Sequence, residues 1–247
     1  MSCVPLVSDT AMVLAAGLGK RMLPLTATTP KPLIEVAGKK LIDHMIDHLA
    51  DAGIARAVVN VHYLPEQIEV YLTGRTDPTV VFSDERNELL ETGGGMVKAW
   101  RAGLLPDPFF CVNSDNIWID GPHNTLFDLS DAWDPARMDA LLLLVPKERA
   151  HQHHGKGDFH LERDGRLRRR GKDEDSAPYI FIGAQIAAHR LLRDAPDGPF
   201  STNLLWDRAI AERRLFGTVH AGEWFDLGTP QAIAPAEAHL AALAGDA

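Results

Sequence analysis

The sequence predicts an α/β fold built on a mostly parallel sheet, and three observations lead to this prediction. Short apolar runs typical of buried strands alternate with segments whose apolar residues recur at helical spacing. Glycines interrupt the chain directly after the first of these runs, where a sharp turn is needed. With 247 residues, 45% of them hydrophobic, the chain is long enough to bury a substantial core. Strands that alternate with helices favour a parallel sheet with right-handed crossovers.

In the first half of the chain, strands are expected at 12–16, 57–61, 80–82 and 109–112, and helices at 41–52, 65–72 and 96–102. In open sheets of this kind, ligands bind beyond the carboxyl ends of the strands. Gly17, Asn60 and Asp115 each follow or end one of these strands. We therefore expect these three residues to emerge at the same edge of the sheet.

The second half is less regular. An apolar strand is expected at 140–145, and Asp164-Gly165 predicts a hairpin between 159–162 and 167–170. A strand at 179–182 and helices at 204–213 and 230–243 complete the chain. No internal repeat, long linker or low-complexity tract divides it. We expect a single domain over residues 1–247, with its core at about 11–242.

Composition excludes several functions. The net charge of −9 argues against a general attraction to nucleic acid. No apolar stretch is long enough to cross a bilayer, and the first ten residues lack the pattern of a signal peptide. The two cysteines, Cys3 and Cys111, are far apart, and neither is expected to be a catalytic thiol. These features favour a cytoplasmic protein without a nucleic-acid or membrane partner.

The segment from 14 to 33 has the composition of a phosphate-binding loop. Gly17 and Gly19 follow the first strand, and backbone N–H groups in such a turn form an anion site. Arg21 can add a forked donor to phosphate oxygens, and Lys31 a mobile point charge. The segment matches neither the dinucleotide-binding glycine pattern nor the Walker pattern. A pair of glycines alone fits an ordinary turn equally well.

The longer string is more specific. L-A-A-G-x-G-x-R-M-x-P-L-T from Leu14, followed by P-K-P-L from Pro30, resembles the signature of the sugar-1-phosphate nucleotidyltransferases, or nucleotide-sugar pyrophosphorylases. The resemblance implies an α/β, single-domain, Rossmann-like three-layer sandwich with a mostly parallel mixed central sheet, of the nucleotide-diphospho-sugar transferase type. No hexapeptide periodicity is present, so the left-handed β-helix domain of some larger relatives is not expected.

The resemblance also implies roles for individual residues. Arg21 and Lys31 would be catalytic, and V-N-x-D and W-x-D-x-G-T-P would supply Mg²⁺ ligands at Asp115 and Asp226. By themselves, both aspartates fit turn or helix caps as well, and Ser114 stands where glycine is common. The implied nucleotide-binding residues are Leu14, Ala15, Ala16, Gly17, Gly19, Asn60, Glu91, Gly93, Gly94 and Asn113.

The stretch Glu91-Thr92-Gly93-Gly94-Gly95 is informative about which nucleotide base is bound. Three glycines fit a plain loop before a helix, but their bare backbone could also lie against a base and contact its edge. With Asn60-x-His62 and Gly157-Asp158-Phe159, the stretch is similar to the N-acetylmuramate-1-phosphate uridylyltransferase branch of the family. That branch makes UDP-N-acetylmuramate from UTP and the sugar 1-phosphate in cell-wall recycling. Mannose-1-phosphate guanylyltransferase activity and a catalytically silent, ligand-sensing subunit are the alternatives.

The sugar side is less well defined. Phe159, Asn203 and Trp224 are candidates for a sugar pocket, although both aromatic residues fit the core equally well. The basic run 166–172 is typical of a solvated hairpin edge but could attract a carboxylate or phosphate. His151, His153 and His154 resemble a metal cluster but favour a polar loop, since no cysteine or helical pair accompanies them. The expected partners are a nucleoside triphosphate and a sugar 1-phosphate, and the expected state is a monomer or homodimer.

Overall fold

The computed structural model describes residues 5–245, with side chains as far as residue 243, so Cys3 lies outside the described part. Within that part, nine strands form one large sheet. They are β1 (Thr10–Leu14), β4 (Arg56–Val61), β5 (Thr79–Asp84), β6 (Phe109–Asn113), β8 (Ala140–Pro146), β10 (Phe159–Leu161), β11 (Leu167–Arg169), β12 (Tyr179–Ala187) and β13 (Leu215–Val219).

β1 lies at the centre of the parallel part of the sheet. It pairs in parallel with β4 on one side and with β6 on the other, and β4 pairs in parallel with β5. β12 runs antiparallel to both β6 and β8, while β8 and β13 are parallel to each other. The predicted α/β fold with a mixed central sheet is therefore confirmed, but the sheet is not mostly parallel: the pairs around β1 are parallel, whereas those of β12 and β10 are antiparallel.

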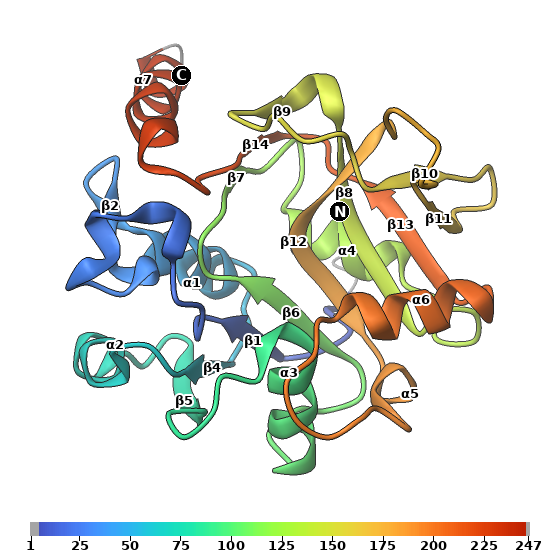
Figure 1. Cartoon of the computed structure of the whole chain (residues 1–247), viewed down its shortest axis with the longest axis horizontal. Helices are drawn as coiled ribbons and strands as arrows, with labels where there is room; N and C mark the ends of the chain where they lie inside the picture. The colour runs from blue at the N-terminus through green and yellow to red at the C-terminus, as the bar shows by residue number, and fades with distance from the viewer. Residues whose placement is uncertain (1–4, 246–247) are drawn as a thin grey trace.

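Helices cover both faces of this sheet (Figure 1). One core cluster joins α1 (Leu41–Asp51), α2 (Pro65–Leu72) and α4 (Thr125–Ala132) to one face. The opposite cluster joins α3 (Glu91–Arg101), α5 (His189–Leu192) and α6 (Asn203–Ala211) to the other face. The side chains of β1 alternate between them, with Val13 in the first cluster and Met12 in the second. The result is the three-layer arrangement that the sequence resemblance implied.

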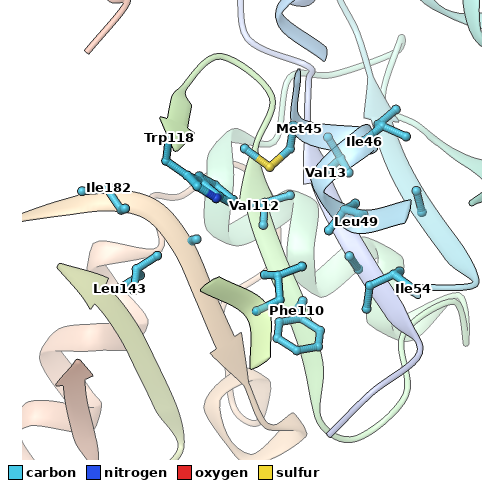
Figure 2. Packing of buried hydrophobic residues seen from close by; sticks show 14 of the residues in the cluster. Val13, Met45, Ile46, Leu49, Ile54, Phe110, Val112, Trp118, Leu143 and Ile182 are labelled. Carbon is cyan, nitrogen blue, oxygen red and sulfur yellow. The ribbon is translucent and has the colours of Figure 1, made fainter. Parts of the chain in front are cut away.

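α1 forms at the position that the spacing of apolar residues predicts, because its apolar side chains pack against the sheet. Met45, Ile46 and Leu49 are each at most 1% exposed. In Figure 2 they lie beside Val13 of β1 and Val112 and Phe110 of β6. Burying aliphatic side chains of this size stabilises the fold by about 1.5–3 kcal/mol each.

Two small sheets stand outside the main one. Glu35–Val36 (β2) pairs with Lys39–Lys40 (β3), and β14 (Glu223–Phe225) pairs with both β7 (Ile117–Ile119) and β9 (Ala150–His151). A third apolar cluster, which includes Met22, Phe225 and Ala236, connects the first loop, β14 and the final helix α7 (Ile233–Gly245). α7 stands at the margin of the molecule, beyond the end of β14 (Figure 1).

The structure corrects the expected start of one helix. The glycines Gly93, Gly94 and Gly95 lie inside α3, which begins at Glu91, rather than in a loop before it. Their low helix propensity misleads here, because tertiary packing holds the turn. A Cβ atom at Gly93 would meet the Phe200 ring at 2.4 Å, and one at Gly94 would meet the Gly198 carbonyl oxygen at 2.5 Å.

Two other expectations concern the reactivity of Cys111 and the presence of membrane-spanning helices. Cys111 is buried in β6, and burial raises the pKa of its thiol to about 12, so this thiol remains protonated and unreactive at neutral pH. None of the helices in the described part of the chain combines the length and apolar character needed to span a bilayer.

Stability should fall as pH drops below about 6.5, in part because of His220. This residue is 3% exposed, and burial lowers its pKa although two backbone carbonyls raise it. Its contribution is complete above the unfolded pKa and is lost as pH falls toward the folded pKa, by up to about 1.4 kcal/mol per pH unit. His220→Gln should flatten this dependence in denaturant unfolding between pH 5 and 8. His123→Gln is the control, because that side chain is 76% exposed; equal slopes for wild type and His220→Gln would contradict the prediction.

Candidate functional site

Two adjoining cavities lie at the carboxyl ends of β1, β4 and β6. The first, of about 400 Å³, is lined by Leu14, Ala15, residues 17–22, Lys31, Pro32, Leu89, Ser114, Asp115 and Gly228. The second, of about 370 Å³, is lined by Leu14, Ala16, Gly17, Asn60, Leu89, Glu91, Thr92, Asn113, Asp115 and Ser201. Leu14, Gly17, Leu89 and Asp115 line both cavities. The expected convergence of Gly17, Asn60 and Asp115 at one edge of the sheet is confirmed.

The loop after β1 is shaped by close contacts around Gly19. Its φ of +61° is left-handed, and a Cβ atom there would meet the Thr26 methyl group at 2.9 Å. The Thr26 hydroxyl donates to the Gly19 carbonyl oxygen at 2.9 Å. Arg21 follows in a short 3₁₀ turn, Lys20–Met22, and lines the first cavity. A Cβ atom at Gly17 would meet no atom within 4 Å, so the backbone there is open on that side.

Lys31 and Asp115 form an ion pair in the first cavity. The Lys31 ammonium donates to Asp115 Oδ2 at 2.6 Å, although the two residues are 84 positions apart. Lys31 is only 8% exposed, and its pairing with a carboxylate compensates the charge that burial would otherwise penalise. The Ser114 hydroxyl donates to the Leu14 carbonyl oxygen at 2.7 Å. The serine therefore ties the end of β6 to β1 and leaves the Asp115 carboxylate in the cavity.

Asp226 reaches the same region from the segment after β14. Its Oδ2 lies 2.9 Å from His153 Nδ1, and its Oδ1 accepts from the Gly228 N–H at 3.1 Å. Burial acts to raise the pKa of Asp226, but the hydrogen bond and charge of His153, together with Arg21 and Lys31, lower it overall. Asp226 is therefore held as a carboxylate among cations, which is the form that binds a metal ion.

Asn60 is held by a buried carboxylate. Its Nδ2 donates to Glu85 Oε1 at 2.8 Å, while its Oδ1 accepts from the Ala15 N–H at 2.7 Å. Glu85 is 1% exposed, and burial raises the pKa of its carboxyl group although Asn60 and the Leu90 N–H lower it. A Cβ atom at Gly95 would lie 2.7 Å from Glu85 Oε1 and 2.9 Å from Asn60 Nδ2. The third glycine of α3 therefore makes room for the pair that fixes the start of the phosphate loop.

The other two glycines of α3 do not line either cavity. Gly93 and Gly94 both donate their N–H groups to the Phe200 carbonyl oxygen, at 2.9 and 3.1 Å. These donors are already used within the protein, whereas the neighbouring Glu91 and Thr92 line the second cavity. Asn113 and Asn60 line the same cavity from β6 and β4.

The three sugar-pocket candidates lie outside both cavities. Phe159 is fully buried, and its ring packs edge-on against Trp206. Trp224 is 3% exposed and belongs to the core cluster beneath α1. Their rings are covered because they complete the core, which corrects the expectation that they present a free face to a sugar. Asn203 is exposed at the start of α6, where its side-chain oxygen accepts from Arg169.

The basic run 166–172 forms ion pairs at the hairpin edge. Arg166 pairs with Asp164, Arg168 with Glu174, and Arg169 with Asp207.

The histidines after β8 behave differently from the expected polar loop. His151 contacts Glu223, and His153 contacts Asp226, so both are partly buried in contacts more than 70 residues away in sequence. Sequence spacing gave no sign of these partners, nor of the role of Glu85.

Comparison with known proteins identifies the family. The family model described as nucleotidyl transferase matches residues 10–155, more than half of the chain. The chain belongs to the nucleotidyl transferase family. This nucleotidyl transferase is 46% identical over 235 residues to the N-acetylmuramate alpha-1-phosphate uridylyltransferase of Caulobacter vibrioides, covering 94% of this chain and 96% of the relative. It is 32% identical over 237 residues to the enzyme of the same name from Neisseria meningitidis serogroup B, covering 92% and 96%.

Other relatives match less of the chain or are more distant in sequence. The mannose-1-phosphate guanylyltransferase catalytic subunit beta of Drosophila melanogaster is 36% identical over 110 residues, covering 43% of this chain and 30% of the relative. A crystal structure of UDP-glucose pyrophosphorylase complexed with UDP-glucose superposes with a TM-score of 0.76 at 16% identity, covering 95% of this chain and 98% of the other. This nucleotidyl transferase therefore shares the fold of that enzyme.

The Asn60–Glu85 contact gives a sharp test of how the loop is held. Asn60→Asp would place a second carboxylate against Glu85, which should lower the free energy of unfolding by about 2–3 kcal/mol. Adding Glu85→Gln supplies an amide donor and should restore part of this loss. Urea unfolding of the two single variants and the double variant should show a coupling of at least about 1 kcal/mol. Strictly additive effects would mean that the two side chains do not interact.

Proposed function

We propose that the enzyme condenses UTP with N-acetylmuramate 1-phosphate to give UDP-N-acetylmuramate and pyrophosphate. The observation that supports this most strongly is the meeting of Arg21, Lys31, Asp115 and Asp226 at one edge of the sheet, beside the second cavity. Cations and carboxylates together suit a reaction between two phosphate groups. The likeness to two uridylyltransferases over nearly their whole lengths supports the choice of base and sugar.

The reaction needs alignment and charge neutralisation more than proton transfer. An oxygen of the sugar 1-phosphate is already anionic, and it attacks the α-phosphorus of the nucleotide. A new P–O bond forms there while the bond to the β-phosphate oxygen breaks, and pyrophosphate leaves with that electron pair. Arg21 would neutralise the departing pyrophosphate, and Lys31 would contact the α-phosphate.

The donor set at this edge fits Mg²⁺. Asp115 and Asp226 offer carboxylate oxygens, which are the ligands that Mg²⁺ prefers, and the lowered pKa of Asp226 keeps one of them ionised. When bound, Mg²⁺ would supply positive charge to the nucleotide and sugar phosphates. The His153 ring fixes the orientation of the Asp226 carboxylate, and the Lys31 ammonium does the same for Asp115.

The base would occupy the second cavity. Glu91 and Thr92 line it at the start of α3, together with Asn60 and Asn113 at the ends of β4 and β6. The Ala15 N–H is held by Asn60, which keeps the backbone between the two cavities in one conformation. The triphosphate would extend from there into the first cavity, toward Arg21 and Lys31.

A panel of pyrophosphate-release assays tests the proposal. UTP, GTP, CTP and dTTP would each be combined with the 1-phosphates of N-acetylmuramate, mannose and glucose. We expect kcat/KM to be highest for UTP with N-acetylmuramate 1-phosphate, by at least about 100-fold over GTP with mannose 1-phosphate. A preference for the GTP pair would favour the guanylyltransferase alternative. Failure of every pair would favour a silent, ligand-sensing subunit.

Loss of a site charge should lower turnover without unfolding the protein. Lys31→Ala and Asp226→Asn should each reduce kcat/KM by about 10²–10³-fold. Asp226→Asn should also raise the Mg²⁺ concentration needed for half-maximal rate. The Asp115 side chain is 33% exposed, so water can solvate it when Lys31 is removed, and the melting temperature should change little.

Two surface variants serve as matched controls for the lost charges. Lys147 and Asp51 are exposed and line neither cavity, so Lys147→Ala and Asp51→Asn should keep the wild-type rate. Near-normal turnover in Lys31→Ala or Asp226→Asn would refute the assigned roles.

A further inference from the structure

Three metal-ligating side chains meet outside the two cavities. His151 of β9, Glu223 of β14 and His239 of α7 each offer one ligand atom, and these atoms lie within 4.8 Å of one another. The residues come from three segments separated by 72 and 16 positions in sequence. All three are partly buried, so the group lies neither on the open surface nor sealed from solvent. Asp115 and Asp226 do not belong to this group.

Neighbouring side chains hold the two histidine rings in place. His151 Nε2 contacts Glu223 directly, and the ring stacks on Phe225 with centroids 4.9 Å apart. His239 packs edge-on against the same Phe225 ring at 5.2 Å and lies 4.4 Å from the His151 ring. Phe225 is fully buried and forms an apolar floor beneath both imidazoles. An apolar shell of this kind lowers the local dielectric and restricts solvent around a metal site.

We propose that His151, Glu223 and His239 form a second metal site that binds a divalent transition-metal ion of the Zn²⁺ type. Two imidazoles and one carboxylate are a ligand set that Zn²⁺ uses in three-ligand sites, with water at the remaining position. Each metal–ligand bond is about 2.0–2.2 Å long, so small side-chain rotations bring the three ligand atoms onto one ion. Nitrogen ligands favour such ions over Mg²⁺, which prefers oxygen.

The bound ion would fasten the final helix to the small sheet. His239 is carried by α7, whereas His151 and Glu223 are carried by β9 and β14, which pair in parallel. The same segments lead directly to the nucleotide site, because the Asp226 N–H donates to the His151 carbonyl oxygen at 3.0 Å. The second site therefore holds in place the strand pair from which Asp226 and His153 extend.

Zn²⁺ binding to the untagged, metal-stripped full-length protein tests the proposal. Competition with a chromophoric chelator should show one equivalent bound at the second site, and His239→Ala and Glu223→Gln should each weaken that binding at least tenfold. Outer-sphere partners already contribute about 10–100-fold, so a direct ligand should contribute no less. Zn²⁺ at 100 times its dissociation constant should raise the melting temperature of wild type by about 5–10 °C.

Controls separate this site from the nucleotide site. The double variant Asp115→Asn/Asp226→Asn should keep the Zn²⁺ equivalent, as should His123→Ala, which removes an exposed histidine elsewhere. Co²⁺ in place of Zn²⁺ should give a visible absorption band in wild type and in the double aspartate variant, but not in Glu223→Gln. Circular dichroism would verify that each variant folds. The proposal falls if wild type binds no Zn²⁺, if His239→Ala and Glu223→Gln both retain it, or if the double aspartate variant loses it.

Discussion

The position of β1 between β4 and β6 is the constraint on which the candidate site depends. The parallel registers place Leu14 opposite both Asn60 and Asn113, so three loops leave the sheet at one edge. Side chains extend this pairing beyond the strands, since Asn60 accepts from the Ala15 N–H and Ser114 donates to the Leu14 carbonyl oxygen. A shift of register by one residue would turn these side chains to the other face of the sheet. The relative positions of the residues in the site are therefore set by the register of these three strands.

The chain is acidic overall, yet its first cavity, in the candidate site, concentrates cations. The net charge is −9, while Arg21 and Lys31 line the first cavity together with Asp115. Side chains that can pair lie close together here: Lys31 Nζ is 2.6 Å from Asp115 Oδ2, and His153 Nδ1 is 2.9 Å from Asp226 Oδ2. Pairing offsets the desolvation of each group in the absence of ligand. Under the proposed function, the same groups would exchange these internal partners for phosphate oxygens or a metal ion.

The sequence predicted the elements with strong periodicity and short connections. The helix at 65–72 and the hairpin around Asp164-Gly165 form as expected. β7 and β14 escaped prediction because these three-residue strands carry too little periodicity and, unlike β10 and β11, are not joined to each other by a short turn such as Asp164-Gly165. Gly93–Gly95 misled because glycine disfavours helices locally, while the reason for these glycines is contact with Phe200, Gly198 and Glu85. Likewise, the burial of Phe159 and the meeting of His151 with Glu223 depend on tertiary packing that spacing does not encode.

The second half of the chain, whose sequence pattern is weaker, decides where Asp226 lies. The Asp226 N–H donates to the His151 carbonyl oxygen, and the Asp226 carboxylate contacts His153. Residues 151–153 therefore hold both the backbone and the side chain of Asp226. Strand β9, which contains His151, pairs with β14, and Phe225, the last residue of β14, packs against His239 of α7. A displacement of α7 would therefore shift the contacts of His239 with Phe225 and with His151, and both of these residues hold Asp226 in place. This explains why a helix at the margin of the molecule bears on a site at the ends of β1, β4 and β6, and why the contact of His239 with Phe225 matters.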